Sequence, residues 1–597
     1  MSVSQEQVEK MRHTLSHVLA AAVQELYPTT TFGVGPAIEN GFYYDIDFGG
    51  EKVSDADLKK IEKKMRGILA RKCEMKAREV ARVEAEQWMK EQGQKYKLEL
   101  IAELPADEPI TFYDMVAPET GEVIFTDLCK GPHVENLGEI PTDGFRLERI
   151  AGAYWRGDEK REMLTRIYGL AFATREELEA FLAQQEEAKK RDHRKLGKEL
   201  DLFAFSELVG SGLPLFTPRG TILRDMLNEL AQGYRVRCGY RKVCIPHIAN
   251  VDLYKTSGHY QKFPELLQFV SQESGDNLAV KPVSCPHHTQ IFASAPRSYK
   301  ELPVKYLETT MVYRDERKGE LGGLSRVRAI TQDDSHVFCT EDQIEQVFGE
   351  LIESAKDLYK KVGMKLTLRL SFRDDKDAYI GDPEMWEKAQ AAIERMAKKF
   401  EMEYFVGIGE AAMYGPKMDF MAVDALGREW QLATVQLDYA MPARFGLEYT
   451  DKDGTKKTPI MVHCALLGAI ERFMSIFIEH TAGWFPLWCA PEQVRILTVN
   501  SEVKEYVGKI EEVLRGVTLD EPVKANELRF EVDQSDDSLG KKIKRATEMK
   551  IPVVLIVGPK DAEDGVVSVR TREGEEKVKL EELKGWLEEK NRRDLGE

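Results

Sequence analysis

The sequence predicts a multidomain α+β protein whose central part is an antiparallel sheet flanked by helices. With 597 residues the chain is too long for one hydrophobic core, and its length suggests about three or four domains. Between residues 201 and 489, the β-rich runs VKYLETTMVYR, LSRVRAITQDDSHVF and REWQLATVQLDYA favour an antiparallel sheet over strands joined by crossover helices. From about residue 490 strands and helices alternate, which indicates a separate α/β domain.

Residues 1–174 are predicted to form an N-terminal α+β domain. A helical pattern from His13 to Leu26 ends before Pro28, because proline cannot continue a helix. It is followed by the glycine-rich aromatic strand stretch FGVGPAIENGFYYDIDF. A charged helix at roughly 55–91 and a mixed strand region ending in WRGDEKREMLTRIYGLAF complete the domain.

Residues 175–200 are highly charged and have helical spacing, which indicates a solvated helix that links two domains. The sheet domain then covers residues 201–489, and the α/β domain covers residues 490–597. In the α/β domain RILTVN, a helix at 502–515, RFEVDQ, the helix LGKKIKRATEMK and IPVVLIVG alternate as strand and helix.

Composition indicates a soluble, cytoplasmic protein with no membrane partner. The eight cysteines are scattered, which is typical of a reducing compartment, and the N-terminus has no apolar signal segment. The most apolar long stretch, at 461–480, contains Glu471, Arg472 and Glu479, so we expect a buried helix rather than a membrane span. The net charge of −17 argues against general affinity for nucleic acid but leaves room for a local basic track.

The stretch KPVSCPHH at 281–288 raises the first question about chemistry. Cys285 can bind a metal, attack a substrate or fill a core, and Pro286 stiffens the backbone directly after it. Because no C-x-x-C partner stands nearby, a metal site here needs ligands from elsewhere in the chain. The stretch alone leaves the three possibilities open.

Two short segments of the N-terminal domain carry groups of the kind that bind zinc. His13 and His17 are four residues apart in RHTLSH, so on a helix they share one face. Cys129 and His133 are also four residues apart, in DLCKGPHV, where glycine and proline indicate a turn. The four side chains can form a metal or acid–base site, and a capped helix beside a packed turn is the structural alternative.

The segment MVYRDERKGELGGLSRVRAITQDDSHVF concentrates polar groups on one predicted hairpin. A first strand ends in Arg314 and Glu316, and a glycine-containing loop leads to a second strand. Alternation places four side chains on one face of that second strand, namely Arg326, Gln332, Asp334 and His336. Such a face is costly to bury and natural in a substrate pocket, where Arg314 can bind a phosphate with two hydrogen bonds. A hairpin with a solvated outer face is the alternative.

The predicted apolar helix at 465–479 carries Arg472. A buried arginine must meet an anion, which is either a protein carboxylate or a phosphate of a ligand. A salt bridge to Glu471 or Glu479 and a phosphate site are both open on the sequence.

Together these motifs resemble the class II aminoacyl-tRNA synthetases. The hairpin with Arg314, the strand TQDDSH and the helix GAIERF resemble motifs 2 and 3 of that class, and GYRKVCIPHI with Pro246 resembles motif 1, which builds the dimer interface. The runs KPVSCP, TQDDSHVF, YGPKMDF, WQLATVQLDYA and VHCALLGAIERF are similar to the threonyl-tRNA synthetase family in particular. HTLSH, CKGPH and AGAYWRGD resemble the editing domain of that family, and the correspondence runs from about residue 10 to the C-terminus.

The resemblance implies one zinc ion per subunit, which answers the question about Cys285. In the family a motif cysteine and two distant histidines hold zinc, and they correspond to Cys285, His336 and His463. A hydrophobic pocket separates threonine from valine only about a hundredfold by packing, whereas zinc can bind the amino group and the hydroxyl together. Further threonine-binding residues that the resemblance implies are Gln332, Asp334, Gln436 and Tyr414.

The resemblance also implies activation of threonine by ATP, with Mg²⁺ accompanying the nucleotide. Arg314 corresponds to a contact of the α-phosphate and Arg472 to a contact of the γ-phosphate. His259, in TSGHY, matches a histidine near the terminal ribose, and Lys417 lines the catalytic site. The other residues of the ATP site are Glu316, Arg326, Gln431 and Ile330, the last at a position that commonly holds an aromatic or long apolar residue against adenine.

Serine differs from threonine by one methyl group, which gives only about 1–3 kcal/mol of discrimination. The resemblance therefore implies a second site that hydrolyses seryl-tRNA(Thr), and its residues correspond to His13, His17, Cys129, His133, Asp127 and Lys97. Near the C-terminus Arg570 matches an anticodon-reading arginine. The expected partners are tRNA(Thr), ATP, L-threonine and a second copy of the chain in a homodimer.

Two other functions compete with this interpretation. A synthetase-derived, non-catalytic RNA-binding regulatory protein is one, but RNA binding requires neither Arg314 and Arg472 nor the three zinc ligands. A free-standing aminoacyl-tRNA hydrolase is the other, and it explains residues 1–174 but not the rest of the chain.

Overall fold

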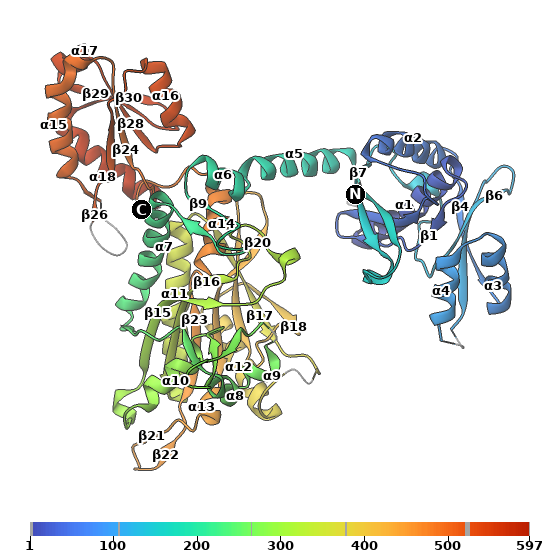
Figure 1. The fold of residues 1–597 in the computed structure, drawn as a ribbon, viewed down its shortest axis with the longest axis horizontal. Coiled ribbons are helices and arrows are strands. Elements are labelled where there is room, and N and C mark those ends of the chain that lie inside the picture. The colour runs from blue at the N-terminus through green and yellow to red at the C-terminus, as the bar shows by residue number, and fades with distance from the viewer. Residues whose placement is uncertain (1–3, 106–107, 264, 377–378, 520–525, 596–597) are drawn as a thin grey trace. The chain divides into compact units, whose positions relative to one another are not determined.

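The computed structural model describes residues 4–105, 108–263, 265–376, 379–519 and 526–595, and the chain falls into two compact units, 1–186 and 187–597 (Figure 1). Helix α5 (Arg175–Arg191) crosses this division. The linker helix predicted at 175–200 is two helices rather than one, because Asp192 starts a second helix, α6 (His193–Glu199). The Asp192 carboxylate caps α6 by accepting from the Arg194 N–H at 2.8 Å.

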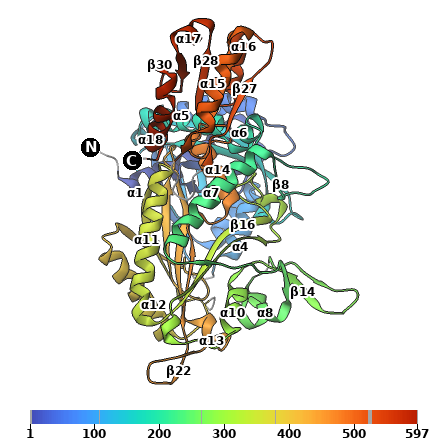
Figure 2. The same ribbon diagram turned by 90° about the vertical axis from the view of Figure 1, so that its left-hand side faces the viewer.

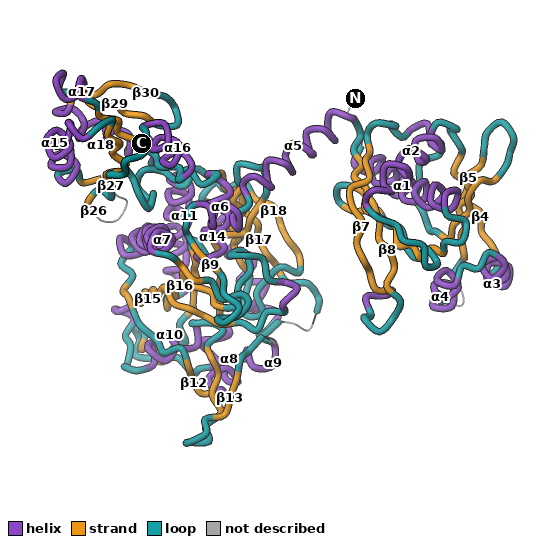
Figure 3. Tube along the Cα trace, turned by 45° about the horizontal axis from the view of Figure 1, so that its top comes forward, coloured by secondary structure: helices purple, strands orange, loops and turns teal. Residues whose placement is uncertain are grey.

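The first unit contains two antiparallel sheets. The larger sheet has the order β1–β3–β8–β7, with β2 paired to β3, and its strands are β1 (Thr31–Phe32), β2 (Ala37–Ile38), β3 (Gly41–Asp47), β7 (Phe145–Tyr154) and β8 (Met163–Ala171). Figure 3 shows the paired strands β7 and β8 side by side. The smaller sheet is formed by β4 (Glu74–Val80), β5 (Ile110–Val116) and β6 (Val123–Leu128). The apolar faces of α1 (Gln5–Leu26) and α2 (Leu58–Leu69) share a core with the larger sheet.

Two predicted elements of this unit have other boundaries. Helix α1 begins at Gln5 rather than at His13, because the Ser4 hydroxyl caps it by accepting from the Gln7 N–H at 3.3 Å. The single helix predicted at 55–91 is wrong, since strand β4 separates α2 from the helices α3 (Arg82–Glu91) and α4 (Lys95–Glu103). Strand β4 pairs with β5 along its whole length, and this tertiary pairing outweighs the helical preference of its charged residues.

An eight-stranded sheet forms the centre of the second unit, in the order β11–β15–β16–β23–β20–β19–β17–β18. Its strands are β11 (Arg241–Lys242), β15 (Val304–Tyr313), β16 (Ala329–Cys339), β17 (Lys365–Phe372), β18 (Tyr404–Ile408), β19 (Lys417–Val423), β20 (Glu429–Asp438) and β23 (Ile460–Ala465). Every pair from β15 to β17 is antiparallel, which confirms the predicted sheet, whereas the edge pairs β11–β15 and β17–β18 are parallel.

Helices cover this sheet and complete its core. The long ones, which run beside the strands in Figure 2, are α7 (Pro218–Arg237), α11 (Ile344–Lys361), α12 (Pro383–Lys399) and α14 (Ile470–Thr481). Shorter elements near the sheet include β9 (Phe203–Ala204), β10 (Leu215–Phe216), α8 (Val251–Ser257), α9 (His259–Lys262), α10 (Cys285–Ala293) and α13 (Ala440–Arg444). A small antiparallel sheet consists of β12 (Ile248–Asn250), β14 (Asn277–Val280) and β13 (Gln268–Val270).

Strand β16 has two faces with different roles. On the core face, the buried Asp333 accepts hydrogen bonds from Arg235 of α7 and from the N–H groups of Leu466 and Leu467, the latter two at 2.9 Å. The opposite face carries Gln332, Asp334 and His336, as alternation predicts. Arg326 does not belong to this face, because the strand begins only at Ala329 and Arg326 lies in the preceding loop.

The apolar stretch at 461–480, predicted as a helix, is a strand followed by a helix. Strand β23 ends at Ala465, and α14 begins at Ile470 after a turn in which Gly468 has a φ of +69°. A run buried on all sides has no periodicity that separates a strand from a helix, so the sequence pattern could not place this boundary. Across the described residues, no helix is long and apolar enough to cross a membrane.

The C-terminal part of the second unit is a five-stranded sheet in the order β27–β24–β28–β29–β30, covered by helices. Its strands are β24 (Val494–Thr498), β27 (Phe530–Asp533), β28 (Val553–Val557), β29 (Val566–Arg570) and β30 (Glu575–Lys579), and its helices are α15 (Lys504–Arg515), α16 (Leu539–Glu548), α17 (Pro559–Asp564) and α18 (Leu583–Asp594). Strands β27, β24 and β28 are parallel, which confirms the predicted α/β fold, and β29 and β30 add an antiparallel hairpin.

Candidate active site and metal centres

Cys285, His336 and His463, the predicted metal ligands, lie together in the second unit. Strands β16 and β23 pair so that His336 stands directly opposite His463, and helix α10 begins at Cys285. One Sγ and two imidazole nitrogens lie within 4.8 Å of one another, and all three residues are buried. One thiolate and two imidazoles form a ligand set that zinc takes in catalytic sites, with positions left for a substrate.

Polar neighbours fix the two imidazole rings of this cluster. Nε2 of His463 lies 2.9 Å from Oδ2 of Asp438, and Nδ1 of His336 lies 2.7 Å from Nδ1 of His288. Such contacts orient a metal-binding histidine by holding one of its ring nitrogens. Neither Asp438 nor His288 was predicted from the sequence. The position of His288 one helical turn after Cys285 is a usable signal, whereas nothing in the sequence marks Asp438.

The protonation states of these groups suit a metal site. Burial, with the charges of Asp334 and Asp438 added, raises the pKa of the Cys285 thiol well above its ordinary value. Burial also lowers the pKa of His336 well below its ordinary value. Neutral imidazoles are ready to bind a metal, whereas a buried thiolate needs a cation to stabilise it. The donor set therefore fits a zinc ion.

The predicted threonine-binding side chains surround this cluster. Gln436 stands opposite His463 in the β20–β23 pair, and the Tyr414 hydroxyl donates to Oε1 of Gln436 at 2.6 Å. The Tyr414 ring stacks on the His463 ring, with 4.7 Å between the centroids. Oδ1 of Asp334 lies 3.6 Å from Nε2 of His336, and burial raises the pKa of this carboxyl. The structure thus places hydrogen-bonding groups next to the candidate metal ligands.

Two further predicted residues lie close to this group. The ring centroid of His259 is 6.4 Å from that of Tyr414, and its Nδ1 is 2.8 Å from the Ser257 hydroxyl. Burial, together with the charge on His463, lowers the pKa of His259 to about 4, so its imidazole is neutral near pH 7. Lys417 begins strand β19, where its Nζ lies 3.1 Å from Oδ2 of Asp419.

A pocket of about 550 Å³ is formed by β16, β20, β23, α14 and the loop before β16. All the residues predicted to bind ATP line it, namely Arg314, Glu316, Arg326, Ile330, Gln431 and Arg472. Gln332 and Gln436 also line this pocket, so it continues towards the Cys285 cluster. Small-molecule sites commonly have volumes of about 300–1,000 Å³, and this pocket falls in that range.

Arg314 and Arg472 reach this pocket without a carboxylate within ion-pair distance among the described residues. The Arg314 guanidinium lies over the Phe263 ring, 5.2 Å from its centroid, and its buried Nε has no hydrogen-bond partner in the described chain. The Arg472 guanidinium lies over the Trp430 ring, 5.9 Å from its centroid. Both guanidinium groups are therefore available to an anionic ligand.

The prediction that Arg472 is buried is wrong, because its side chain is exposed on α14. Within the part of the chain that the structure describes, Arg472 forms no salt bridge with Glu471 or Glu479. The carboxylate of Glu471 instead accepts from the N–H of Thr331 at 2.8 Å and from its hydroxyl at 2.6 Å. Glu479 accepts from Arg428 at 2.6 Å.

Neighbouring groups hold the other polar residues of the pocket. Nη2 of Arg326 lies 2.7 Å from Oε2 of Glu316. This ion pair joins the loop before β16 to the segment that follows β15. Gln431 accepts from Arg369 at 2.6 Å and donates to Asp419 at 2.8 Å. These contacts set the orientation of side chains that face the pocket.

The first unit holds a second group of possible metal ligands. His13 and His17 project from α1, Cys129 directly follows β6, and His133 lies in the next turn. Their ligand atoms also lie within 4.8 Å of one another. Sγ of Cys129 is 3.3 Å from Nε2 of His13 and 3.3 Å from Nε2 of His133. The predicted convergence of the helix and the turn is therefore present in the structure.

A buried ion pair lies beside this second group. Nζ of Lys97 is 2.6 Å from Oδ1 of Asp127, and Nδ1 of His17 is 3.5 Å from Oδ2 of the same carboxylate. The Tyr44 hydroxyl, which was not predicted, donates to Asp127 and accepts from Lys97 at 2.9 Å. Tyr44 belongs to the aromatic run GFYYDID, whose alternation marks it as an inward-facing residue but not as a polar contact.

Burial also controls the charge of this second group. Burial lowers the pKa of His133 and His17 well below the ordinary value. A proton on one histidine of the group would also disfavour a proton on its neighbours, which lowers these pKa values further. Burial raises the pKa of the Cys129 thiol to about 11. Near neutral pH this site therefore presents neutral imidazoles and a protonated thiol.

Arg570 is the last residue of β29, and its side chain is exposed. Its Nη1 lies 3.9 Å from Oε2 of Glu575 on the neighbouring strand. The contact recorded for the Arg570 side chain is with Glu575, and it involves no other predicted site residue.

Three segments of the chain match known family models. Residues 268–481 match the tRNA synthetase class II core domain (G, H, P, S and T), and residues 493–590 match an anticodon binding domain. Residues 110–168 match the threonyl and alanyl tRNA synthetase second additional domain. Together with the antiparallel sheet and its arginine-lined pocket, these matches define a class II aminoacyl-tRNA synthetase fold.

Whole-chain relatives narrow the class to one family. The threonine–tRNA ligase of Gloeobacter violaceus is 49% identical, over 98% of this chain and 92% of that protein. The threonine–tRNA ligase of Thermosynechococcus vestitus is 48% identical, over 95% of this chain and 92% of that protein. The chain belongs to the threonine–tRNA ligase family.

Solved structures agree with this assignment. The RNA binding domain of threonyl-tRNA synthetase from Cryptosporidium parvum aligns with a TM-score of 0.61 and 32% identity, and covers 67% of this chain and 98% of that one. A prolyl-tRNA synthetase from the same organism, with a TM-score of 0.53 and 17% identity over 68% of this chain and 76% of that one, shares the fold alone.

The Cys285 cluster predicts a specific metal content. We expect the dialysed protein to contain about one zinc per chain held by this cluster, as measured by elemental analysis. Cys285→Ser should lose that zinc, because a hydroxyl is a poor substitute for a thiolate ligand. Cys244→Ser, which changes an exposed cysteine, is the matched control and should retain it. Equal zinc content in all three proteins would rule out Cys285 as a ligand.

Proposed function

We propose that this protein activates threonine with ATP to form threonyl-adenylate and then transfers the threonyl group to tRNA(Thr). The observation that carries the proposal is the pocket lined by all the residues predicted to bind ATP, which continues towards Cys285, His336 and His463. Membership of the threonine–tRNA ligase family supports it. A non-catalytic RNA-binding protein would need neither feature, so that alternative is the weaker explanation.

Positioning and charge account for the activation step. The threonine carboxylate attacks the α-phosphorus of ATP and forms a new P–O bond. The bond from that phosphorus to the bridging oxygen breaks, and pyrophosphate leaves with its electron pair. Arg314 is proposed to bind the α-phosphate and Arg472 the γ-phosphate, because neither guanidinium is bound to a described carboxylate. Fixed guanidinium groups stabilise the negative charge that develops on the phosphate oxygens. Mg²⁺ bound to ATP supplies further neutralisation of the triphosphate.

Selection of threonine is assigned to the Cys285 cluster and its surroundings. Cys285, His336 and His463 would hold a zinc ion, which would supply a Lewis acid that favours a substrate with both an amino group and a hydroxyl. Asp334 and Gln332 lie on the same strand face as His336 and offer acceptors to the amino group. Gln436, held by the Tyr414 hydroxyl, closes the other end of the site.

The proposal predicts threonine-dependent ATP–pyrophosphate exchange by the purified protein. Valine should support exchange at least roughly 100-fold less well in kcat/KM, because it lacks the hydroxyl. Serine should be rejected less strongly, roughly 10- to 200-fold, because it lacks only a methyl group. Exchange that is absent with threonine, or equal with threonine and valine, would contradict the proposed function.

We further propose that the first unit hydrolyses seryl-tRNA(Thr). His13, His17 and His133 are neutral through burial, so each imidazole can accept a proton from an attacking water. The Cys129 thiol lies within 3.3 Å of two of these rings and remains protonated near neutral pH. The Lys97–Asp127 pair reaches His17 through Oδ2 of Asp127, at 3.5 Å, and offers a charged partner for the ester.

This second site predicts a defect confined to hydrolysis. The double change His13→Ala, His17→Ala should slow deacylation of preformed seryl-tRNA(Thr) by roughly 100-fold or more, because it removes proton acceptors from the site. Threonylation should stay within about twofold of the wild type, since the pocket of the second unit is unchanged. His247→Ala, at a histidine of the second unit, serves as control. Wild-type deacylation by the double variant would refute the assignment of these histidines.

Three further parts of the proposal concern partners and boundaries. The C-terminal sheet is proposed to bind the anticodon through Arg570, whose exposed guanidinium can contact a guanine edge.

A homodimer is proposed because large apolar side chains are exposed around β9 and β10, namely those of Phe205, Leu208, Val209 and Leu215. The proposed domains are 1–174, 201–489 and 490–597, joined by the linker at 175–200.

A further inference from the structure

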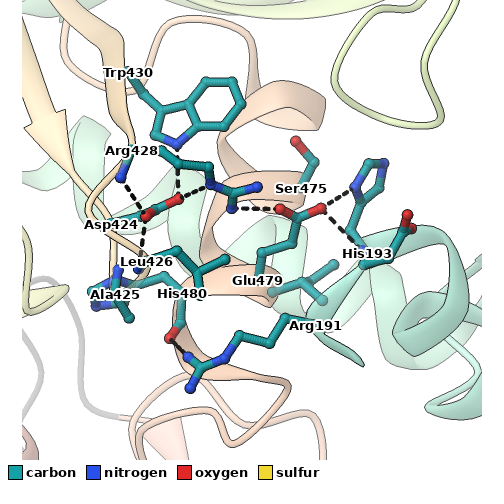
Figure 4. A network of polar contacts seen from close by, with 12 residues as sticks. Arg191, His193, Asp424, Ala425, Leu426, Arg428, Trp430, Ser475, Glu479 and His480 are labelled. Carbon is teal, nitrogen blue, oxygen red and sulfur yellow. Dashed lines mark hydrogen bonds and ion pairs between the residues drawn. The ribbon is translucent and has the colours of Figure 1, made fainter. Parts of the chain in front are cut away.

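His193, the first residue of α6, connects α6 with α14 and with the loop before β16. Figure 4 shows its contacts with Glu479 of α14. Its backbone N–H and its Nδ1 both lie within hydrogen-bond distance of Oε1 of Glu479 on α14, at 3.1 and 2.7 Å. Its Nε2 accepts from the backbone N–H of Leu324 at 3.1 Å. Leu324 belongs to the loop before β16 and lines the proposed ATP pocket.

These contacts define which nitrogen of His193 carries the proton. Glu479 is a carboxylate, since the bonds from His193 and Arg428 outweigh the effect of burial and lower its pKa. Nδ1 therefore donates to Glu479, and Nε2 carries a lone pair that accepts from Leu324. A neutral imidazole in this tautomer satisfies both contacts, and a methyl or hydroxymethyl side chain satisfies neither.

The loop is shaped to admit this imidazole. Gly323, next to Leu324, has a φ of +58°, and a Cβ built on it would lie 2.3 Å from Nε2 of His193. A side chain at this position would displace the ring from the Leu324 N–H. The glycine thus provides both the backbone conformation and the space that the contact needs.

A continuous chain of polar contacts leads from His193 to the other side of the pocket. Oε2 of Glu479 accepts from Arg428 at 2.6 Å, and Nε of Arg428 donates to Asp424 at 2.7 Å. The Trp430 indole N–H donates to the same Asp424 carboxylate at 2.9 Å (Figure 4). The Trp430 ring lies under the Arg472 guanidinium, which also lines the pocket.

Asp192, His193 and Glu479 also form a group of possible metal ligands. Metal binding is the weaker explanation, because both nitrogens of His193 already have hydrogen-bond partners and Arg428 neutralises Glu479. Asp192 is likewise occupied as the cap of α6. Hydrogen bonding therefore accounts for this cluster without an ion.

We propose that His193 is a positioning residue for ATP, which holds the loop at Leu324 against α14 and so sets the separation of the two sides of the nucleotide pocket. The inference rests on the proposed function, in which Arg326 of this loop and Arg472 of α14 bind the same nucleotide. His193 touches no substrate itself, and it acts through the backbone of Leu324 and the carboxylate of Glu479. The three matching family models do not include it, since they cover residues 110–168, 268–481 and 493–590.

Two isosteric substitutions separate the two contacts of the ring. In His193→Asn the side-chain amide occupies the position of Nδ1, so the bond to Glu479 is kept and the bond to Leu324 is lost. In His193→Gln the amide oxygen reaches the position of Nε2, so the bond to Leu324 is kept, and the backbone N–H of residue 193 keeps its bond to Glu479. We expect His193→Asn to raise the KM for ATP roughly tenfold, and His193→Gln to restore it to within about threefold of the wild type. The KM for threonine should change less than about twofold in both variants.

Direct calorimetry of Mg²⁺–ATP binding by the full-length protein separates this inference from the proposed function. The Kd for ATP should rise in the same order as the KM, from the wild type through His193→Gln to His193→Asn, even if no exchange activity is found. Gly323→Ala provides a second variant, and we expect the same loss because its Cβ displaces the ring. Arg191→Gln is the matched linker control, since Arg191 contacts the His480 carbonyl at 3.1 Å and not the loop.

Unchanged ATP affinity in His193→Asn, or an equal rise in the KM for threonine and for ATP, would overturn the inference. A lower melting temperature with unchanged ATP affinity in both His193 variants would assign the residue to packing alone. Absence of exchange in the wild type would instead count against the proposed function, and the calorimetric order would still decide the role of His193.

Discussion

The antiparallel pairing of β16 with β23 is the constraint on which the candidate active site depends. This register places His336 opposite His463, and the β20–β23 register places Gln436 beside the same histidine. If β16 were shifted by one residue against β23, His336 would point to the core face that packs against α7, and Asp333 would point into the site. The register is held from the core side, where Asp333 bonds to Arg235 and to the N–H groups that follow β23. A buried carboxylate on one face thus fixes the candidate metal ligands on the other.

Most of the fold was predictable from the sequence where its patterns were periodic. The strands around Val304–Tyr313 and Glu429–Asp438 and the alternating C-terminal elements lie where the patterns predicted. The predictions failed where tertiary pairing decides the outcome. Strand β4 is charged and adopts its conformation through β5, and the uniformly apolar run at 461–480 contains no period that marks its division into β23 and α14.

The site shows the same division between pattern and tertiary structure. Residues that follow one another in motifs, such as Gln332, Asp334 and His336, were found by alternation. The convergence of His463 with Cys285 came from the family resemblance, because the two residues are 178 positions apart in the sequence. Asp438 and His193 were missed, since their roles depend on partners that are distant in sequence. Physical patterns in one sequence identify faces of elements, and contacts between elements need the structure.

We propose that the Cys285 cluster holds a zinc ion and that threonine binds directly to this ion. X-ray absorption at the zinc edge, measured on the full-length protein with and without saturating threonine, tests it most directly. We expect the ligands of the zinc ion to include one sulfur and two imidazole nitrogens, and we expect threonine to add or replace nitrogen and oxygen ligands. Valine at the same concentration should leave these ligands unchanged. A zinc shell without sulfur, or a spectrum that threonine does not alter, would contradict the account.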